Sequence, residues 1–211
     1  MRDHMPDTKT KLLDAALETL RTQGIAGASA RAIATTAGVN QALVFYHFGS
    51  VDQLLSDACV RGAEQRVAAN RERFAAVTSV RGLLDLGRQV HEEERAAGNV
   101  AALAQLLAGS QSDERLAPAT ATGLNLWVAE LEGTLARVLK DTPLADVPGL
   151  SRAIAAAFIG LELYEGVDRE GAAQALDALE QLASLVTVLD EMSPLVRRAV
   201  RGRLRKALRT P

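Results

Sequence analysis

The feature that most constrains this chain is a pair of short helix patterns joined by a tight turn, between residues 29 and 48. Ser29 is a hydroxyl N-cap for the first helix. The inward face of that helix carries three apolar residues, Ala30, Ile33 and Ala34. Gly38 suits the positive φ of a turn, and Asn40 can accept a backbone N–H at the start of a second helix, residues 41 to about 47. The pattern therefore predicts two short helices folded against each other.

The second helix has one face that packing does not need. Val44 and Phe48 lie four residues apart and predict its inward face. A helix held in this way can enter the major groove of DNA, which shows a distinct pattern of donors and acceptors for every base pair. Residues 29–48 are therefore predicted to form a helix-turn-helix motif that binds duplex DNA.

At this point the sequence resembles the TetR family of bacterial transcriptional regulators. The matching residues are Gly24, Ser29, Arg31, Ile33, Ala34, Ala37, Gly38, Val39, Phe45, His47, Phe48 and Leu54. Phe45 stands where the family usually has Tyr, and Val51 where it usually has Lys, so two expected phosphate contacts are missing. The resemblance covers about the first quarter of the chain. It implies a homodimer that binds a palindromic DNA operator and a small-molecule effector.

The residues expected to contact DNA lie on both helices of the motif: Ser29, Arg31, Asn40, Gln41, Ala42, Leu43, Tyr46 and His47. Gln41 can bond an adenine edge, and Ala42 or Leu43 can pack on a thymine methyl group. The others are expected at phosphates, helped by the backbone N–H groups at the helix starts. The alternative, that any one of them is an ordinary surface residue of a three-helix unit, stays open.

The rest of the chain predicts helices only, because no run shows the period-two alternation of a strand. We expect an all-α fold with a helix-turn-helix DNA-binding domain at residues 1–50. A helical effector-binding and dimerisation domain should follow at residues 51–211, with residues 51–75 as the linking helix. The first helix should run from near Asp7 or Thr8 to Gln23. Ser50 to Gln53 matches a capping box for the linking helix.

Composition narrows the class of protein. With 48% hydrophobic and 24% charged residues, the chain is typical of a soluble globular protein. No apolar run approaches the roughly 20 residues that span a bilayer, and the polar N-terminus lacks a secretory signal, so we expect a cytoplasmic protein without a membrane partner. The body is acidic, whereas residues 1–50 are weakly basic. DNA affinity should therefore come from a few phosphate contacts with moderate salt dependence.

We expect no enzyme, no cofactor and no metal site. The run from His91 to Arg95 departs from the zinc motif H-E-x-x-H, because Arg95 stands at the second His, and it is expected to be a solvated helix face. One cysteine and three scattered histidines supply no ligand set for a structural metal. Cys59 is expected to be a buried, inert thiol, with a redox sensor as the alternative.

The sequence predicts two late helices, residues 150–165 and 172–192. The resemblance to the TetR family implies that they pair with their copies in a second subunit. The candidate interface residues are Ile154, Phe158, Leu161, Leu179, Leu182 and Val186. Filling of the protomer's own core is the alternative. The candidate effector-binding residues are Trp127, Phe158, Glu162 and Glu165, for which core packing or solvent exposure is the alternative. The basic segment 195–208 is expected to be a terminal helix, with a nucleic-acid or membrane contact as the alternative.

The sequence thus predicts a transcriptional regulator. The resemblance to the TetR family implies a repressor that is released from its operator when an effector in the C-terminal domain moves the fourth helix. Two alternatives stay open: a transcriptional activator of the same fold, and a non-enzymatic helical interaction protein without an effector.

Overall fold

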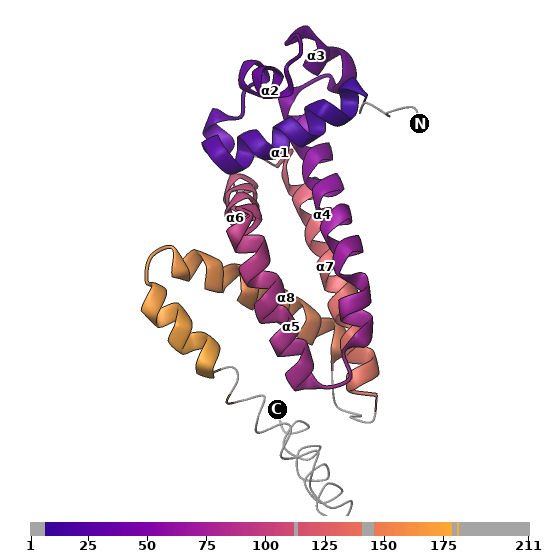
Figure 1. Ribbon diagram of the computed structural model, residues 1–211, viewed down its shortest axis with the longest axis vertical. Helices are drawn as coiled ribbons and strands as arrows, with labels where there is room; N and C mark the ends of the chain where they lie inside the picture. Colours follow the sequence, from indigo (N-terminus) through magenta and orange to yellow (C-terminus); the bar gives the residue numbers. More distant parts are fainter. Residues whose placement is uncertain (1–6, 112–113, 141–145, 179–180, 182–211) are drawn as a thin grey trace, which may run out of the picture. The chain divides into compact units, whose positions relative to one another are not determined.

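The computed structural model describes residues 7–111, 114–140, 146–178 and 181, and every regular element among them is a helix (Figure 1). The first four are α1 (Thr8–Gly27), α2 (Ala30–Ala37), α3 (Ala42–Phe48) and α4 (Val51–Ala76). The chain continues with α5 (Val80–Ala96), α6 (Asn99–Gly109), α7 (Ala117–Val138) and α8 (Val147–Glu165). A further helical stretch covers residues 169–178. The predicted all-α class is confirmed.

The helices pack into two compact units. The first holds residues up to 71 together with residues 91–130, and so contains α1, α2, α3 and α6 entire. The second holds residues 72–90 and those from 131 onward. The predicted domain boundary at residue 50 stays a prediction.

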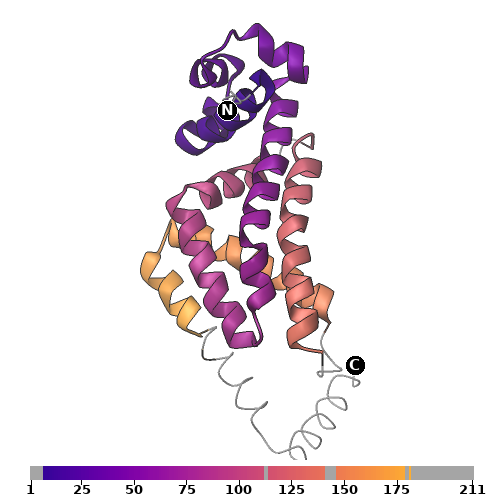
Figure 2. The same cartoon turned by 45° about the vertical axis from the view of Figure 1, so that its right-hand side comes forward.

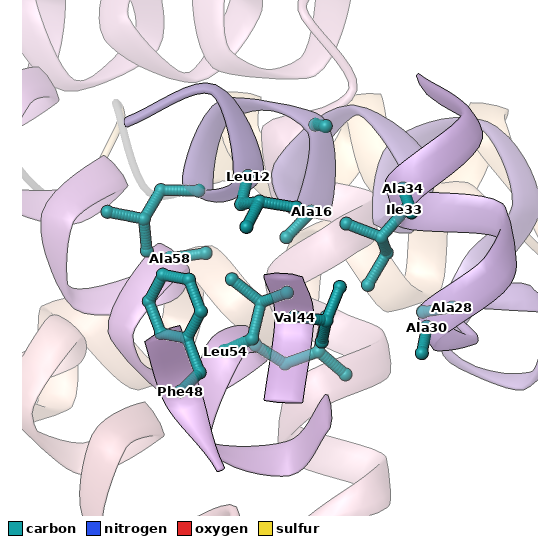
Figure 3. Packing of buried hydrophobic residues seen from close by; sticks show 13 residues of the cluster. Leu12, Ala16, Ala28, Ala30, Ile33, Ala34, Val44, Phe48, Leu54 and Ala58 are labelled. Atoms are coloured by element: carbon teal, nitrogen blue, oxygen red, sulfur yellow. The ribbon is translucent and has the colours of Figure 1, made fainter. Parts of the chain in front are cut away.

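One hydrophobic core joins the first four helices (Figure 3). Each helix contributes a side chain with no exposed surface: Leu12, Ile33, Val44 and Leu54. Burial of one such side chain stabilises the fold by about 1.5–3 kcal/mol. The inward faces predicted for α2 and α3 are confirmed, since Ala30, Ala34 and Phe48 lie in the same core. This packing decides which face of α3 remains outside.

Local hydrogen bonds set the ends of these helices. Ser29 Oγ accepts the Ala32 N–H at 3.2 Å, and Ser50 Oγ accepts the Gln53 N–H at 3.1 Å, so both predicted N-caps are confirmed. Gly38 has φ 66°, and its N–H donates to the carbonyls of the last turn of α2. Asp7 caps α1 by accepting the Thr10 N–H at 2.7 Å, and this bond lowers the pKa of the Asp7 carboxyl.

The last turn of α1 is held by α6, which lies against it in both views (Figures 1 and 2). Gly24 has φ 69° and ψ 178°, so the regular part of α1 ends at Gln23, as predicted. Beyond this kink the Ile25 N–H donates to Gln105 Oε1 at 2.8 Å. A side-chain amide of α6 thus completes the hydrogen bonding of the α1 terminus.

Two sequence expectations need correction. The helix expected from residue 150 begins at Val147, because Asp146 Oδ1 accepts the Gly149 N–H at 3.0 Å and Pro148 needs no donor in a first turn. The run from His91 to Arg95 is only partly solvated. His91 is buried and Glu94 is half-buried, because these two positions on α5 turn inward, where Glu94 pairs with Arg66 at 2.9 Å.

By length and composition, α8 is the one helix among the described residues that could cross a membrane, which is weak evidence by itself. A helix that spans a membrane and a helix that packs inside a protein both need a long apolar surface, so the composition of α8 alone does not separate the two.

Candidate nucleic-acid interface

The outward face of α3 carries the residues predicted to read DNA. Tyr46 is 80% exposed, and Gln41 and Ala42 are exposed at the first turn. Leu43 and His47 are half-buried, and Leu43 packs against the core of the first four helices. The helix therefore offers its N-terminal turn and Tyr46 to a partner, while Leu43 also serves the packing of the domain.

Asn40 shapes the entrance of α3. Its Oδ1 accepts the Ala42 N–H at 2.8 Å, which leaves its two amide N–H donors for another acceptor. Ser29 uses its oxygen in the cap of α2 in the same way, so its hydroxyl proton can still be donated. Both residues are exposed, as is Arg31. Three donors thus lie near the starts of two helices, where backbone N–H groups and the helix dipole favour an anion.

Lys9 is a residue at this surface that the sequence reasoning missed. Its ammonium lies 5.6 Å from the centroid of the Phe48 ring, so the start of α1 brings a positive charge beside the end of α3. His47 contacts Tyr46 edge to face, with ring centroids 5.0 Å apart. No sequence motif marks the position of Lys9. The weakly basic character of residues 1–50 was the only signal in the sequence that could have pointed to it.

The effector candidates fall in different places. Trp127 is half-buried and lines a cavity in the first unit. Phe158 lies in the second unit with its ring against Gly87, and Glu165 pairs with Arg169 at 3.7 Å. The side chain of Glu162 lies outside the described part of the structure. The four residues are not brought together into one described cavity.

The interface candidates on α8 are half-buried in the protomer: Ile154, Phe158 and Leu161. The neighbouring face of α8, across the helix from the buried Ser151 and Ala155, is exposed and apolar. We call the residues that form it the α8 stripe: Leu150, Ala153, Ala157, Gly160 and Tyr164. The other candidates, Leu179, Leu182 and Val186, lie outside the described residues, as does the segment 195–208. Among the described residues, no group of three metal-binding side chains occurs.

Comparison with known proteins shows which family the first part of the chain resembles. Residues 12–58, which include the helix-turn-helix and its core, match the model of the bacterial regulatory proteins of the tetR family. The likeness to this family in sequence therefore covers the helix-turn-helix region, residues 12–58. Regulators of this family bind DNA and are generally not enzymes. No curated protein matches the chain in the comparison.

Solved structures with a TetR-family fold resemble most of the chain. A protein of Streptomyces coelicolor A3(2), provisionally described as a transcriptional regulator, is 25% identical with a TM-score of 0.66, over 84% of this chain and 99% of its own. A TetR-family protein of a Rhodococcus species is 22% identical with a TM-score of 0.70, over 85% and 99%. The multidrug binding protein EbrR, crystallised with imidazole, is 24% identical with a TM-score of 0.60, over 83% and 96%. The chain therefore has the fold of a TetR-family transcriptional regulator.

Proposed function

We propose that this protein is a cytoplasmic, non-enzymatic repressor that binds a palindromic operator as a homodimer and is released by a small-molecule effector. The observation that carries the DNA-binding part is the geometry of α3. Val44 and Phe48 anchor the helix in the core, while Asn40, Gln41 and Tyr46 stay exposed on its outer face. A helix presented in this way can lie in the major groove with its first turn at the base edges.

The dimer is supported by the α8 stripe. Its members recur at intervals of three and four residues, which places them along one side of the helix. Small residues at Ala153, Ala157 and Gly160 let a second helix approach closely, and Leu150 and Tyr164 are large apolar groups exposed at 40% and 50%. A continuous apolar helix face of this kind is typical of a surface that a partner covers. Ile154 and Leu161 border the stripe and stay candidates for the same interface.

The effector is supported by the cavity beside Trp127 and by the fold shared with EbrR, a multidrug binding protein. An effector releases the operator only if it binds the DNA-free state more tightly, and the operator must then weaken the effector by the same factor. An activator of the same fold would bind the same DNA, so a reporter gene placed behind the operator distinguishes the two signs of regulation.

The experiment that tests the proposal is selection of bound duplexes from a random library by the full-length protein. We expect the selected sequences to share two inverted half-sites with centres about 34–36 Å apart, or a multiple of that spacing. Enrichment of no sequence, or of an unpaired single site, would contradict a palindromic operator. A helical interaction protein without DNA-binding activity would enrich nothing.

A further inference from the structure

The cavity in the first unit is lined by positively charged side chains but by no negatively charged ones. Its volume is about 40 Å³, and its wall is mostly apolar, with residues from α1, α4, α6 and α7 that include Leu17, Leu20, Ala63, Ala102, Leu106 and Trp127. The charged residues of this wall are two arginines, Arg21 and Arg66, and no carboxylate belongs to it. Polar recognition inside the cavity therefore favours an acceptor of hydrogen bonds with negative charge.

Arg66 has N–H groups without an acceptor among the described residues. Its Nε lies 2.9 Å from Oε2 of Glu94, and Asn99 Nδ2 donates to the same oxygen at 3.0 Å. No hydrogen bond from the two terminal nitrogens of Arg66 occurs within the part of the chain that the structure describes. Within the described residues, the buried Nε also makes no hydrogen bond of good geometry, although it lies close to Glu94, and the side chain as a whole is only 24% exposed. Charged N–H groups in such a position are stabilised by an acceptor that reaches them.

Arg21, in contrast, is already engaged. Its Nη2 pairs with Glu18 at 2.8 Å, and its Nη1 donates to Asn99 Oδ1 at 3.3 Å. Asn99 therefore joins the two arginines, one through its oxygen and the other through Glu94. The network holds Nε of Arg66 on the Glu94 side and leaves its Nη1 and Nη2 edge for a ligand.

We propose that this cavity binds a small organic acid, with the carboxylate on the Nη1 and Nη2 edge of Arg66 and the apolar body against the wall near Trp127. The two parallel N–H groups of a guanidinium match the two oxygens of a carboxylate. An amide offers one acceptor to the same edge, and an ammonium group is repelled by both arginines. The inference rests on the proposed effector-responsive function and names the class of effector.

The size of the cavity links this ligand to DNA binding. A cavity of about 40 Å³ holds only a few water molecules, so an acid larger than acetate must displace part of the wall. Leu17, Leu20 and Arg21 belong to α1, which is also a helix of the DNA-binding core. Entry of the acid therefore acts directly on the helix that packs behind α2 and α3.

The test uses the full chain and its single tryptophan, Trp127, as the probe of the cavity. Fluorescence is titrated with acetate, hexanoate and benzoate, and with hexanamide, benzamide and benzylamine as matched compounds. We expect at least one acid to bind tenfold or more tightly than its amide, and benzylamine to bind least. Equal binding of acids and amides, or no binding of any acid, would overturn the inference.

Variants at Arg66 assign the contact. Arg66→Met should abolish the preference for the acid, and Arg66→Lys should weaken acid binding while it keeps some preference, because lysine retains the charge without the paired donors. Arg71→Met is the matched control, since Arg71 lies on the same helix and pairs with Glu130 at 3.2 Å but does not line the cavity. Acid binding that is unchanged in folded Arg66→Lys would reject the site.

Operator binding, measured in parallel on a selected duplex, separates this inference from the proposed function. A protein that binds its operator but shows no preference for acids rejects the acid site alone. A protein that binds acids through Arg66 but binds no DNA rejects the regulator and leaves the site standing.

Discussion

Tyr46 is the most exposed large side chain of α3, at 80%. We expect Tyr46→Ala to weaken binding of the selected operator about fivefold, which corresponds to the loss of roughly 1 kcal/mol from one hydrogen bond. The salt dependence of binding should stay the same, because tyrosine carries no charge. Fluorescence anisotropy with a labelled duplex measures both quantities.

The control for this change is Tyr46→Phe, which removes only the hydroxyl. If both variants lose a similar amount of operator affinity, the effect comes from a hydrogen bond of the Tyr46 hydroxyl. If only Tyr46→Ala loses affinity, the effect comes from the ring. Both proteins should melt like the wild type, since the side chain is exposed. Wild-type affinity in both variants would show that α3 does not lie on the DNA as proposed.

Cys59 is the only cysteine of the chain, and burial raises its pKa from an ordinary value of 9.0 to about 12. The thiol therefore stays protonated at neutral pH, and its reaction with iodoacetamide at pH 8 should be at least tenfold slower in the folded protein than in urea. Because the folded pKa is raised, its contribution to stability is present below pH 9 and is lost as pH rises towards 12. Equal rates of labelling in the two states would favour the redox-sensor alternative instead.

At the scale of the helices, the contact between α1 and α6 depends on one side-chain amide. Gln105 Oε1 accepts the Ile25 N–H at 2.8 Å, just beyond the kink at Gly24. We expect Gln105→Leu to lower the free energy of unfolding by about 1–3 kcal/mol, because a partly buried backbone donor loses its acceptor. Urea denaturation followed by circular dichroism measures the change.

Gln65→Leu, at an exposed position of α4, is the matched control and should stay within about 0.5 kcal/mol of the wild type. If the two variants unfold at the same urea concentration, the hydrogen bond to Ile25 contributes nothing to the stability of the helix pair.

At the scale of the whole molecule, the α8 stripe decides the oligomeric state. Ala157→Arg places a long charged side chain in the middle of the stripe, where close approach of a second helix needs a small residue. We expect the wild type to sediment as a dimer and this variant as a monomer, with operator affinity reduced at least tenfold because one half-site is no longer held by the other.

Ala136→Arg, at an exposed position of α7, serves as the control and should remain dimeric. Analytical ultracentrifugation measures both variants at the same protein concentration. A dimer that survives Ala157→Arg would move the interface away from the stripe, and a monomeric wild type would remove the dimer from the proposal altogether.

The features that could be predicted from the sequence are those that depend on near neighbours. Ser29, Gly38 and Ser50 act on the backbone within a few residues, so a cap or a positive φ can be inferred from the local pattern alone. The inward positions of Val44 and Phe48 follow from helical periodicity in the same way. The helix-turn-helix was accessible to sequence reasoning because its geometry is local.

The tertiary structure decided what depends on residues far apart in the chain. Arg66 meets Glu94, and Ile25 meets Gln105, only because the fold brings α4 to α5 and α1 to α6. Periodicity showed that α8 is apolar around much of its circumference, but the packing of Phe158 against Gly87 determined which side is covered within the protomer. An apolar pattern predicts that a helix surface is covered by another surface. Only the three-dimensional contacts show which surface is covered within the protomer and which remains exposed.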